Sequence, residues 1–175
     1  MNENLPKRKD IRLKNVDYSE PGAYFITICT KNKCKMLSNI VGAIHESPEE
    51  DIKLTEYGKI VDEYIKFAQT RFNISINHYV IMPNHVHLII EITPDSVRAI
   101  HESPLQPRSV VSQVIGFIKA NSSKEIHNIH PKLDVWQRGF YDHIIRDKCD
   151  YEEISKYIHE NPLKWQFDEL YLNGE

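Results

Sequence analysis

Two histidines stand one residue apart inside an apolar run, in the stretch IMPNHVHLII at residues 81–90. The run has the composition of a short buried strand that is entered through Pro83 and Asn84. Alternate residues of a strand point to the same face, so His85 and His87 share one face with their backbones roughly 6–7 Å apart. Two imidazoles held in this way can chelate one divalent ion. The pattern favours a metal or phosphate site, and a pair of hydrogen-bonded core histidines is the alternative.

A reaction at such a site needs a nucleophile, and three tyrosines further along the sequence are candidates. Tyr157 and Asn161 are four residues apart in the stretch KYIHENP, so on a helix they lie one above the other. Tyr157 borders an apolar stripe, where its ring can pack while its hydroxyl faces a cleft. The spacing does not separate Tyr157 from an ordinary core ring, and Tyr151 and Tyr141 are rivals by the same reasoning.

The elements that would position these side chains follow the order β-α-β-β-α-β-α. Hydrophobic periodicity predicts strands over 22–30, 73–82, 85–92 and 140–147, and helices over 54–72, 109–128 and 149–161. Ser109 and Asp150 are the expected helix caps, and Pro83-Asn84 is the expected turn of a hairpin. The first six elements match the split βαβ arrangement of a ferredoxin-like α+β fold. That fold is an antiparallel sheet with helices on one face, followed here by a C-terminal helix.

The hexapeptide AIHESP occurs twice, at residues 43–48 and 99–104. Six residues are too few for a structural repeat unit, and both copies fall between predicted elements. Each copy ends in Ser-Pro, which favours a turn. We therefore expect two loop insertions, around 41–50 and 96–108, because surface loops tolerate added residues.

Composition limits the class of protein. The chain has 175 residues, enough for one domain with its own core, and a formal net charge of −3. That charge does not indicate strong nonspecific binding to nucleic acid. Basic residues nevertheless gather in an N-terminal arm, residues 1–15, which is either solvated or in contact with phosphates. Without a recognisable signal peptide or membrane-spanning run, we expect a cytoplasmic protein with free thiols at Cys29, Cys34 and Cys149.

His85-Val86-His87 resembles the HUH motif of single-tyrosine transposases, in the PxHxH form of the IS200/IS605 superfamily. Three further stretches are similar to one IS200-like branch, the REP-associated tyrosine transposases: DYSEPGAYFIT (17–27), WQRGFYDHIIR (136–146) and YIHENP (157–162). The resemblance runs from about Arg12 to Trp165, with the motifs in the order of the family and the expected elements between them.

The resemblance implies a role for each matched residue. His85 and His87 would hold a divalent ion, Mg²⁺ or Mn²⁺, as the cofactor. Tyr157, on the helix after the last core strand, would be the nucleophile. Asn161 stands where the IS200 branch has a glutamine, and it would complete the metal site.

The implied activity is metal-dependent cleavage of single-stranded DNA, with strand transfer through a 5′-phosphotyrosine intermediate, on hairpins from repeated palindromes. The implied domain covers 16–165 and is followed by a tail over 166–175. IS200 relatives imply a homodimer with an exchanged helix and REP-associated relatives a monomer, so both states stay open. DNA contacts are expected from the arm, from aromatic side chains that stack on bases and from cations that meet phosphates. The candidates are Lys7, Arg8, Arg12, Lys119, Trp136, Arg138, Tyr141, His143 and Arg146.

Two rival functions remain. A histidine-triad nucleotide hydrolase carries a third histidine two positions further on, where this chain has Ile89, and this argues against that class. A domesticated DNA-hairpin-binding protein that has lost cleavage is the non-enzymatic alternative. The chain retains His85, His87 and Tyr157, so the transposase is the preferred prediction.

Overall fold

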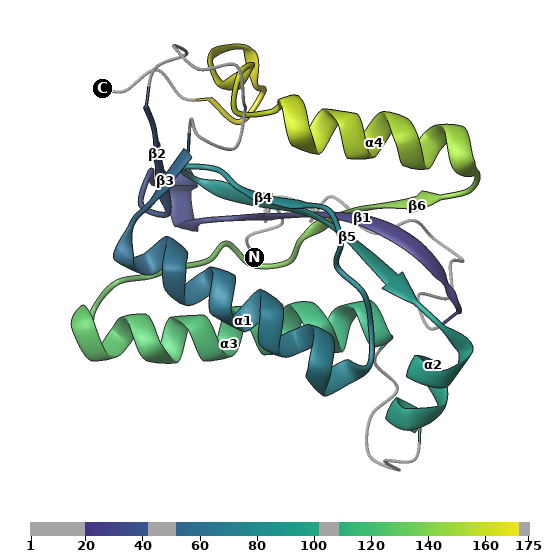
Figure 1. The fold of residues 1–175 in the computed structure, drawn as a ribbon. Coiled ribbons are helices and arrows are strands. Elements are labelled where there is room, and N and C mark those ends of the chain that lie inside the picture. The colour runs from purple at the N-terminus through teal and green to yellow at the C-terminus, as the bar shows by residue number, and fades with distance from the viewer. Residues whose placement is uncertain (1–19, 42–51, 102–108, 172–175) are drawn as a thin grey trace, which may run out of the picture.

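The computed structural model describes residues 20–41, 52–101 and 109–171, which build an antiparallel sheet between layers of helices (Figure 1). In spatial order the sheet contains β4 (Tyr79–Ile81), β5 (His85–Ile92), β1 (Gly22–Cys29) and β6 (Tyr141–Ile145). One face is covered by α1 (Glu56–Phe72) and α3 (Val110–Ile129), and the other by α4 (Lys148–Glu160) (Figure 1). All pairs in this sheet are antiparallel. This topology is the split βαβ arrangement, which confirms the predicted fold class.

Smaller elements were not expected from the sequence. A second, two-stranded sheet pairs β2 (Ser38–Ile40) with β3 (Ile52–Leu54), and short 3₁₀ turns are η1 (Lys31–Lys33) and η3 (Trp165–Phe167). The strand predicted over 73–82 is reduced to β4, preceded by an isolated bridge between Ser75 and Glu91. None of the described helices has both the length and the apolar character that crossing a membrane requires.

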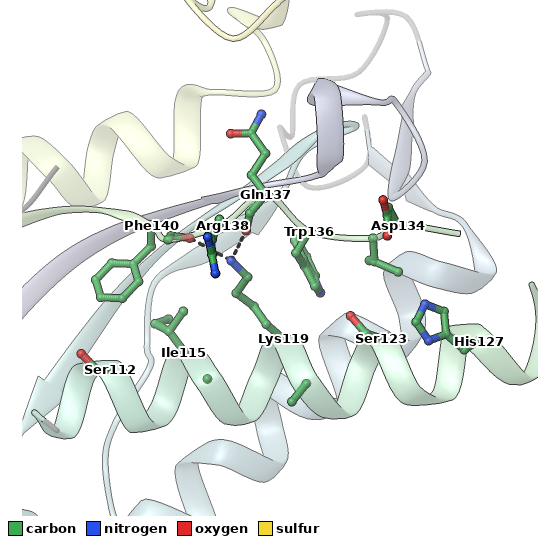
Figure 2. Close-up of a pocket in the computed structure, with 14 residues that line it drawn as sticks. Ser112, Ile115, Lys119, Ser123, His127, Asp134, Trp136, Gln137, Arg138 and Phe140 are labelled. Carbon is green, nitrogen blue, oxygen red and sulfur yellow. Dashed lines mark hydrogen bonds between the residues drawn. The ribbon is translucent and has the colours of Figure 1, made fainter. Parts of the chain in front are cut away.

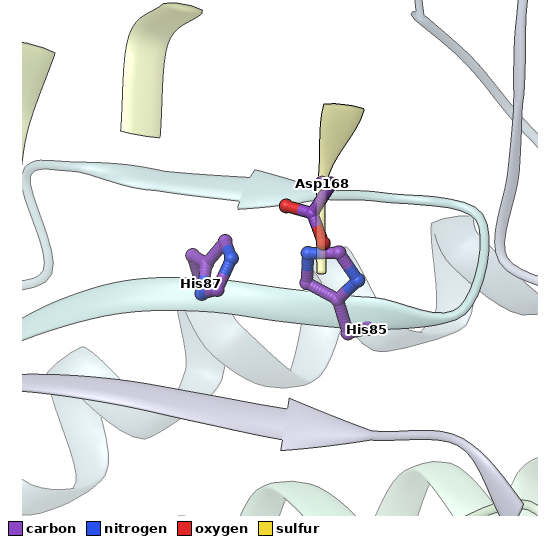
Figure 3. Close-up of side chains that lie close together, drawn as sticks. All are labelled: His85, His87 and Asp168. Atoms are coloured by element: carbon purple, nitrogen blue, oxygen red, sulfur yellow. The ribbon is translucent and has the colours of Figure 1, made fainter. Parts of the chain in front are cut away.

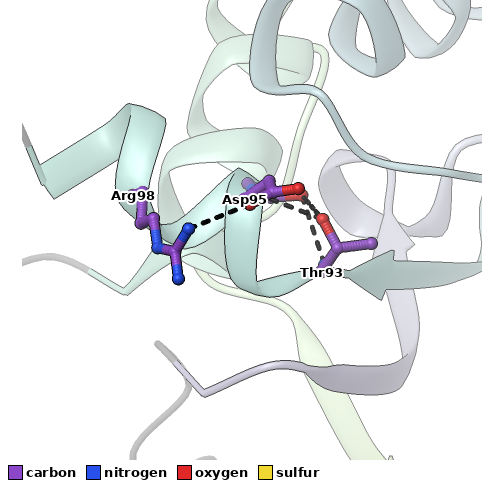
Figure 4. Close-up of polar contacts among 4 residues, drawn as sticks. Thr93, Asp95 and Arg98 are labelled. Carbon is purple, nitrogen blue, oxygen red and sulfur yellow. Dashed lines mark hydrogen bonds and ion pairs between the residues drawn. The ribbon is translucent and has the colours of Figure 1, made fainter.

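The loop predicted around 96–108 is wrong in its first part, which belongs to helix α2 (Pro94–His101). Thr93 and Ser96 cap this helix reciprocally: the Ser96 amide donates to Thr93 Oγ1 and the Thr93 amide donates to Ser96 Oγ, both at 3.2 Å. In the first turn, Asp95 pairs with Arg98 at 3.4 Å (Figure 4). Thr-Pro-Asp-Ser is an ordinary helix start, although the repeated hexapeptide that follows it ends in a Ser-Pro turn signal.

Of the two predicted helix caps, one is confirmed and one is wrong. The Ser109 side chain accepts the Ser112 amide at the start of α3, as expected. The cap of α4 is Asp147, which accepts the Asp150 amide at 3.0 Å. Because α4 begins at Lys148, Asp150 lies inside its first turn, where its carboxylate accepts from His143 at 2.9 Å.

The predicted arm over 1–15 lies outside the described residues. The same is true of the first AIHESP copy, of 102–108 and of the last four residues, so the expected insertions and the ends of the domain stay predictions.

Strand β5 divides the core into two layers. Val86, Leu88 and Ile90 point toward α1 and α3 and belong to the main apolar cluster. Ile89, on the opposite face, packs with Ile158 of α4 and with other apolar side chains. The two histidines alternate with the first set, so the strand places them in the layer between the sheet and α4.

A close approach of backbones fixes the start of α1. The Thr55 amide donates to the Leu37 carbonyl at 2.9 Å, and Gly58 lies against the same carbonyl. A Cβ added at Gly58 would meet the Leu37 oxygen at 2.0 Å, so the backbone would have to move.

We expect Gly58→Ala to lower the free energy of unfolding by about 3 kcal/mol, since the clash is with backbone rather than with a flexible side chain. Gly116→Ala is the matched control, because a Cβ there meets nothing within 4 Å. It should stabilise α3 by about 0.5–1 kcal/mol. Urea unfolding of both variants measures the difference, and equal effects would contradict the tight contact.

Candidate active site

The two histidines share one face of β5, as the alternation predicts. Their ring centroids lie 4.4 Å apart, and the side chains of His85 and His87 are 0% and 3% exposed. Around them, Phe25 of β1 lies 5.2 Å from the His87 ring and Trp165 of η3 lies 5.8 Å from the His85 ring. The imidazoles are therefore held in a dry layer by the sheet and by the segment after α4.

The tautomer of His85 follows from its neighbour. The Asn84 side-chain amide donates to the Leu170 carbonyl at 2.9 Å, so its other atom, Oδ1, must be the acceptor that faces His85 Nδ1 at 2.8 Å. His85 then carries its proton on Nδ1, and Nε2 presents a bare lone pair. This Nε2 atom is buried and has no hydrogen-bond partner among the described residues. A buried lone pair without a donor is the condition of a metal ligand.

His87 is oriented from the neighbouring strand. Thr27 lies opposite it in the register of β1 and β5, and Thr27 Oγ1 is 2.8 Å from His87 Nδ1. When Nδ1–H donates to this hydroxyl, the Nε2 lone pair points away from the sheet. Nε2 faces the Tyr157 hydroxyl at 3.3 Å. The contact with Thr27 thus orients His87 Nε2 as a second nitrogen ligand, and Tyr157 lies next to this atom.

Asp168 belongs to the site and was missed, since it falls in the predicted tail over 166–175. The η3 turn directs the chain back over the sheet, and Figure 3 shows the Asp168 carboxylate pointing toward the two imidazoles. One ligand atom from each of His85, His87 and Asp168 lies within 4.8 Å of the others. No motif marks this aspartate, because its place depends on how the chain returns after α4.

Asn161 lies beside this carboxylate at the C-terminal end of α4. Its side chain is 2% exposed, and its Nδ2 donates to Asp168 Oδ2 at 2.9 Å. Its Oδ1 is buried and lacks a partner within the described ranges. Together, His85, His87, Asn161 and Asp168 offer two imidazole nitrogens and two oxygens, with two of these atoms orphaned. Such a mixed set fits a divalent cation of the Mn²⁺ or Mg²⁺ type.

Tyr157 is the one of the three rival tyrosines that borders the histidines. The residue is 44% exposed, and its hydroxyl donates to Asp168 Oδ2 at 3.4 Å. Burial and the Asp168 carboxylate raise the pKa of Tyr157 to about 12. Tyr151 instead donates to Glu91 at 2.7 Å, and Tyr141 is exposed on the edge strand β6. Only Tyr157 combines access to solvent with contact to the site.

Burial also keeps both histidines neutral. It lowers the pKa of His85 from 6.5 to about 3, with a smaller contribution from Lys33, and it lowers the pKa of His87 well below its usual value. Neutral imidazoles bind a cation without first releasing a proton.

This neutrality predicts acid sensitivity in a chelator-containing buffer. The unfolded chain protonates His85 below pH 6.5, whereas the folded protein excludes that proton down to about pH 3. The free energy of unfolding should therefore fall with falling pH across this window, by about 1.4 kcal/mol per pH unit for this residue. Urea unfolding at pH 7 and pH 5 measures the slope. His85→Gln should reduce the slope and leave the contribution of His87, whereas the exposed control His159→Gln should leave the slope unchanged. Equal slopes in the two variants would refute the burial argument.

Three of the predicted DNA contacts gather around a pocket of about 610 Å³ between α3 and residues 134–140 (Figure 2). The Lys119 ammonium donates to the Gly139 carbonyl at 2.8 Å and to the Gln137 carbonyl, and burial lowers the pKa of Lys119 to about 8. The Trp136 indole donates to Ser122 Oγ at 3.1 Å. Both side chains hold the segment against α3, whereas Arg138 is exposed at the rim.

The other candidates lie at the sheet edge or outside the described ranges. Tyr141 pairs with Thr27 and His143 with Phe25 across β6 and β1, so both point to the face that carries His87. His143 contacts Asp150, and Arg146 is exposed just beyond the strand. Lys7, Arg8 and Arg12 lie in the part of the chain that is not described.

Comparisons with known proteins agree with this fold. No family model matches the chain. An uncharacterized protein from Haemophilus influenzae is 37% identical, over 98% of this chain and 97% of its own length. A candidate REP-associated tyrosine transposase from the same organism is 22% identical, over 88% of this chain and 77% of its own. A solved REP-associated tyrosine transposase bound to a REP hairpin superposes with a TM-score of 0.57 at 21% identity, covering 90% of this chain and 77% of that one. The chain therefore belongs to the family of the first of these relatives, and the resemblance to REP-associated tyrosine transposases predicted from its motifs is confirmed.

Proposed function

We propose that this transposase-like protein cuts and rejoins single-stranded DNA at hairpins, with Tyr157 as the nucleophile. The observation that carries the proposal is the contact between the Tyr157 hydroxyl and His87 Nε2, beside the orphaned lone pair of His85. A half-exposed tyrosine next to two neutral imidazoles and two side-chain oxygens offers a nucleophile and a cation site together, which supports phosphodiester cleavage through a covalent intermediate.

A divalent cation would be held by His85, His87, Asp168 and Asn161. When bound, it would polarise the scissile phosphate and favour the phenolate form of Tyr157, whose pKa of about 12 is otherwise too high for attack at neutral pH. The protein's own part is to hold these groups. Asn84 and Thr27 fix the two imidazoles through their Nδ1 atoms, and Phe25 supports the Tyr157 ring edge-on, at 6.1 Å between centroids.

In the proposed step, Tyr157 Oη attacks the phosphorus of the scissile phosphodiester. A bond forms between Oη and phosphorus, the bond to the 3′ oxygen breaks, and that oxygen takes up a proton. The phenol proton leaves to solvent, since Tyr157 is 44% exposed. The strand is left with a free 3′-OH and a 5′-phosphotyrosine. Attack by a 3′-OH on this phosphotyrosine reverses the step and rejoins DNA without an external energy source.

We infer the DNA partner from the surface and from a relative. The solved relative is bound to a REP hairpin, and we extend that class of DNA to the present chain. Exposed Tyr141 and His143 lie on the face of His87, and Arg138 and Arg146 are exposed on either side of β6, where they could meet bases and phosphates. Helix α4 packs on the sheet, and we propose the site for a monomer or for a homodimer that exchanges this helix. We expect the protein to act in the cytoplasm, at the nucleoid.

A covalent-capture assay tests the proposal. Purified protein is mixed with end-labelled hairpin DNA from repeats that flank its own gene, with Mn²⁺, with Mg²⁺ or with a chelator, and is run on a denaturing gel. We expect a shifted band with metal and none with the chelator. A complex on a native gel without any covalent band, in both metals, would instead support a hairpin-binding protein that does not cut.

A further inference from the structure

The turn that follows β1 carries two residues in an unusual backbone conformation. Asn32 and Lys33 have positive φ angles of 55° and 54°, although neither is a glycine. This left-handed region costs free energy for residues with a side chain, and such positions cluster at functional sites. The Lys33 side chain is partly exposed, and its ammonium makes no hydrogen bond or ion pair with a described residue. Its protons are therefore available to a ligand.

Hydrogen bonds fasten this turn to the hairpin that carries the histidines. Thr30 is 0% exposed, and its amide donates to the Asn84 carbonyl at 2.9 Å. The Thr30 hydroxyl donates to the Cys34 carbonyl at 2.8 Å, which closes the turn. Asn84 also orients His85 through its side chain. The strained turn and the imidazole thus have a common support, which fixes the place of the one relative to the other.

The register of β1 and β5 orders the groups of the site along the sheet. His87 and His85 follow one another along β5 (Figure 3). Thr27 of β1 stands opposite His87, the histidine that contacts Tyr157. Cys29 stands opposite His85. The turn begins directly after Cys29, so it lies at the end of the site away from Tyr157.

The electrostatic effects of Lys33 agree with this order. Burial lowers the pKa of His85 to about 3, and the Lys33 charge adds to this effect. Burial raises the pKa of the Cys29 thiol, and the same charge opposes that rise. For His87 and Tyr157 the pKa shifts come from burial and from other charged neighbours. Lys33 therefore lies on the His85 side of the site.

The geometry of displacement at phosphorus gives this side a role. The attacking and leaving oxygens lie roughly in line, on opposite sides of the phosphorus atom. With Tyr157 next to His87, the 3′ oxygen leaves on the side of His85 and Lys33. An alkoxide leaves slowly unless it receives a proton, and a positioned ammonium group is a suitable donor.

We propose that Lys33 is the general acid that protonates the leaving 3′ oxygen when Tyr157 attacks. The inference rests on the proposed function. The bond between phosphorus and the 3′ oxygen breaks, and its electron pair stays on that oxygen. One proton passes to it from the Lys33 ammonium, which leaves a neutral amine and a free 3′-OH. In the rejoining step the amine takes a proton back from the attacking 3′-OH. A lysine that only attracted the DNA backbone would not need a strained turn to fix its place.

A substrate whose leaving group needs no proton tests this role. In a 3′-S-phosphorothiolate, sulfur replaces the 3′ oxygen at the cleavage point, and a thiol with a pKa of about 8.5 leaves readily as the thiolate. The cleavage point is first mapped with the parent protein on ordinary hairpin DNA. Adduct formation is then timed in Mn²⁺ for the oxygen and the sulfur substrate, with the protein in excess over labelled DNA.

Two variants of Lys33 are compared with the parent. Lys33→Met should form the adduct about a hundredfold more slowly from the oxygen substrate, and within about threefold of the parent rate from the sulfur substrate. Lys33→Arg keeps the charge but does not release a proton, so it should show the same selective defect. The control Lys31→Met, exposed on the same turn, should match the parent with both substrates.

Metal affinity separates this role from damage to the site. Lys33→Met should bind Mn²⁺ as tightly as the parent or more tightly, because a positive charge is removed from beside the cation site. A weaker affinity for Mn²⁺, together with an equal rate defect on both substrates, would show a structural role and would overturn the inference.

The inference is also overturned if sulfur does not restore the rate of Lys33→Met, or if Lys33→Arg reaches the parent rate on the oxygen substrate. If the parent forms no adduct with either substrate, the proposed function fails, and the inference fails with it. The failure of the inference alone is thus distinguishable, because the parent then still forms the adduct.

Discussion

Replacing Tyr157 with phenylalanine is expected to reduce covalent adduct formation by at least about a thousandfold, since the attacking oxygen is removed. DNA affinity should stay within about twofold, because the ring and its packing on Phe25 are kept. Among the described residues the hydroxyl makes only long polar contacts, at 3.3 Å to His87 Nε2 and at 3.4 Å to Asp168 Oδ2, so its loss has little structural effect. The measurement is the denaturing-gel assay for the adduct and a filter or anisotropy titration for binding.

Tyr151→Phe is the matched control, on the same helix. Its hydroxyl donates to Glu91 at 2.7 Å, and it has no contact with the histidine pair. We expect this variant to form the adduct at close to the parent rate, with a small loss of stability from the broken hydrogen bond, about 1 kcal/mol. If Tyr157→Phe still forms an adduct and Tyr151→Phe does not, the assignment of the nucleophile is wrong.

The sequence was sufficient for those parts of the site that a local pattern encodes. His85 and His87 alternate within an apolar strand, and a period of two residues places them on one face wherever the strand pairs. Tyr157 and Asn161 share one face of a helix for a similar reason. The contact between these two pairs is tertiary, because it depends on α4 crossing the face of the sheet opposite α1 and α3. The family resemblance, rather than the spacing, predicted that Tyr157 and Asn161 lie next to the two histidines.

Other parts of the site and its surroundings depend on tertiary contacts and could not be predicted from local patterns in the sequence. Asp168 joins the site through the return of the chain after η3, and a lone aspartate in a turn carries no periodic signal. The contacts of Lys119 within the chain are a second example, since its ammonium donates to backbone carbonyls 18 and 20 residues later in the sequence. Backbone carbonyls have no sequence signature, so only the structure identifies such partners. The start of α2, by contrast, was readable from Thr93 and Ser96.

Removing one of the two nitrogen ligands is expected to lower the metal affinity of the protein strongly. His85→Ala should lower the affinity of the protein for Mn²⁺ by at least about a hundredfold, since even changes outside the first layer of ligands lower metal affinity by about tenfold to a hundredfold. The reason is specific to this histidine. Its Nε2 is buried, is held as a lone pair by Asn84 and has no competing donor among the described residues. Isothermal titration with Mn²⁺, in the absence of DNA, measures the change without reference to catalysis.

The variant Asp168→Asn distinguishes the contribution of the carboxylate to metal binding from that of the histidines. This variant keeps the size of the side chain but removes its negative charge, and we expect it to weaken Mn²⁺ binding by about tenfold. It should also lower the pKa of Tyr157, because the Asp168 charge is one cause of the raised value. Ultraviolet titration of the metal-free protein would detect that shift. His159→Ala, an exposed histidine on α4, is the control and should bind Mn²⁺ as the parent does. If His85→Ala also binds as the parent does, while remaining folded by circular dichroism, the four side chains do not form a cation site.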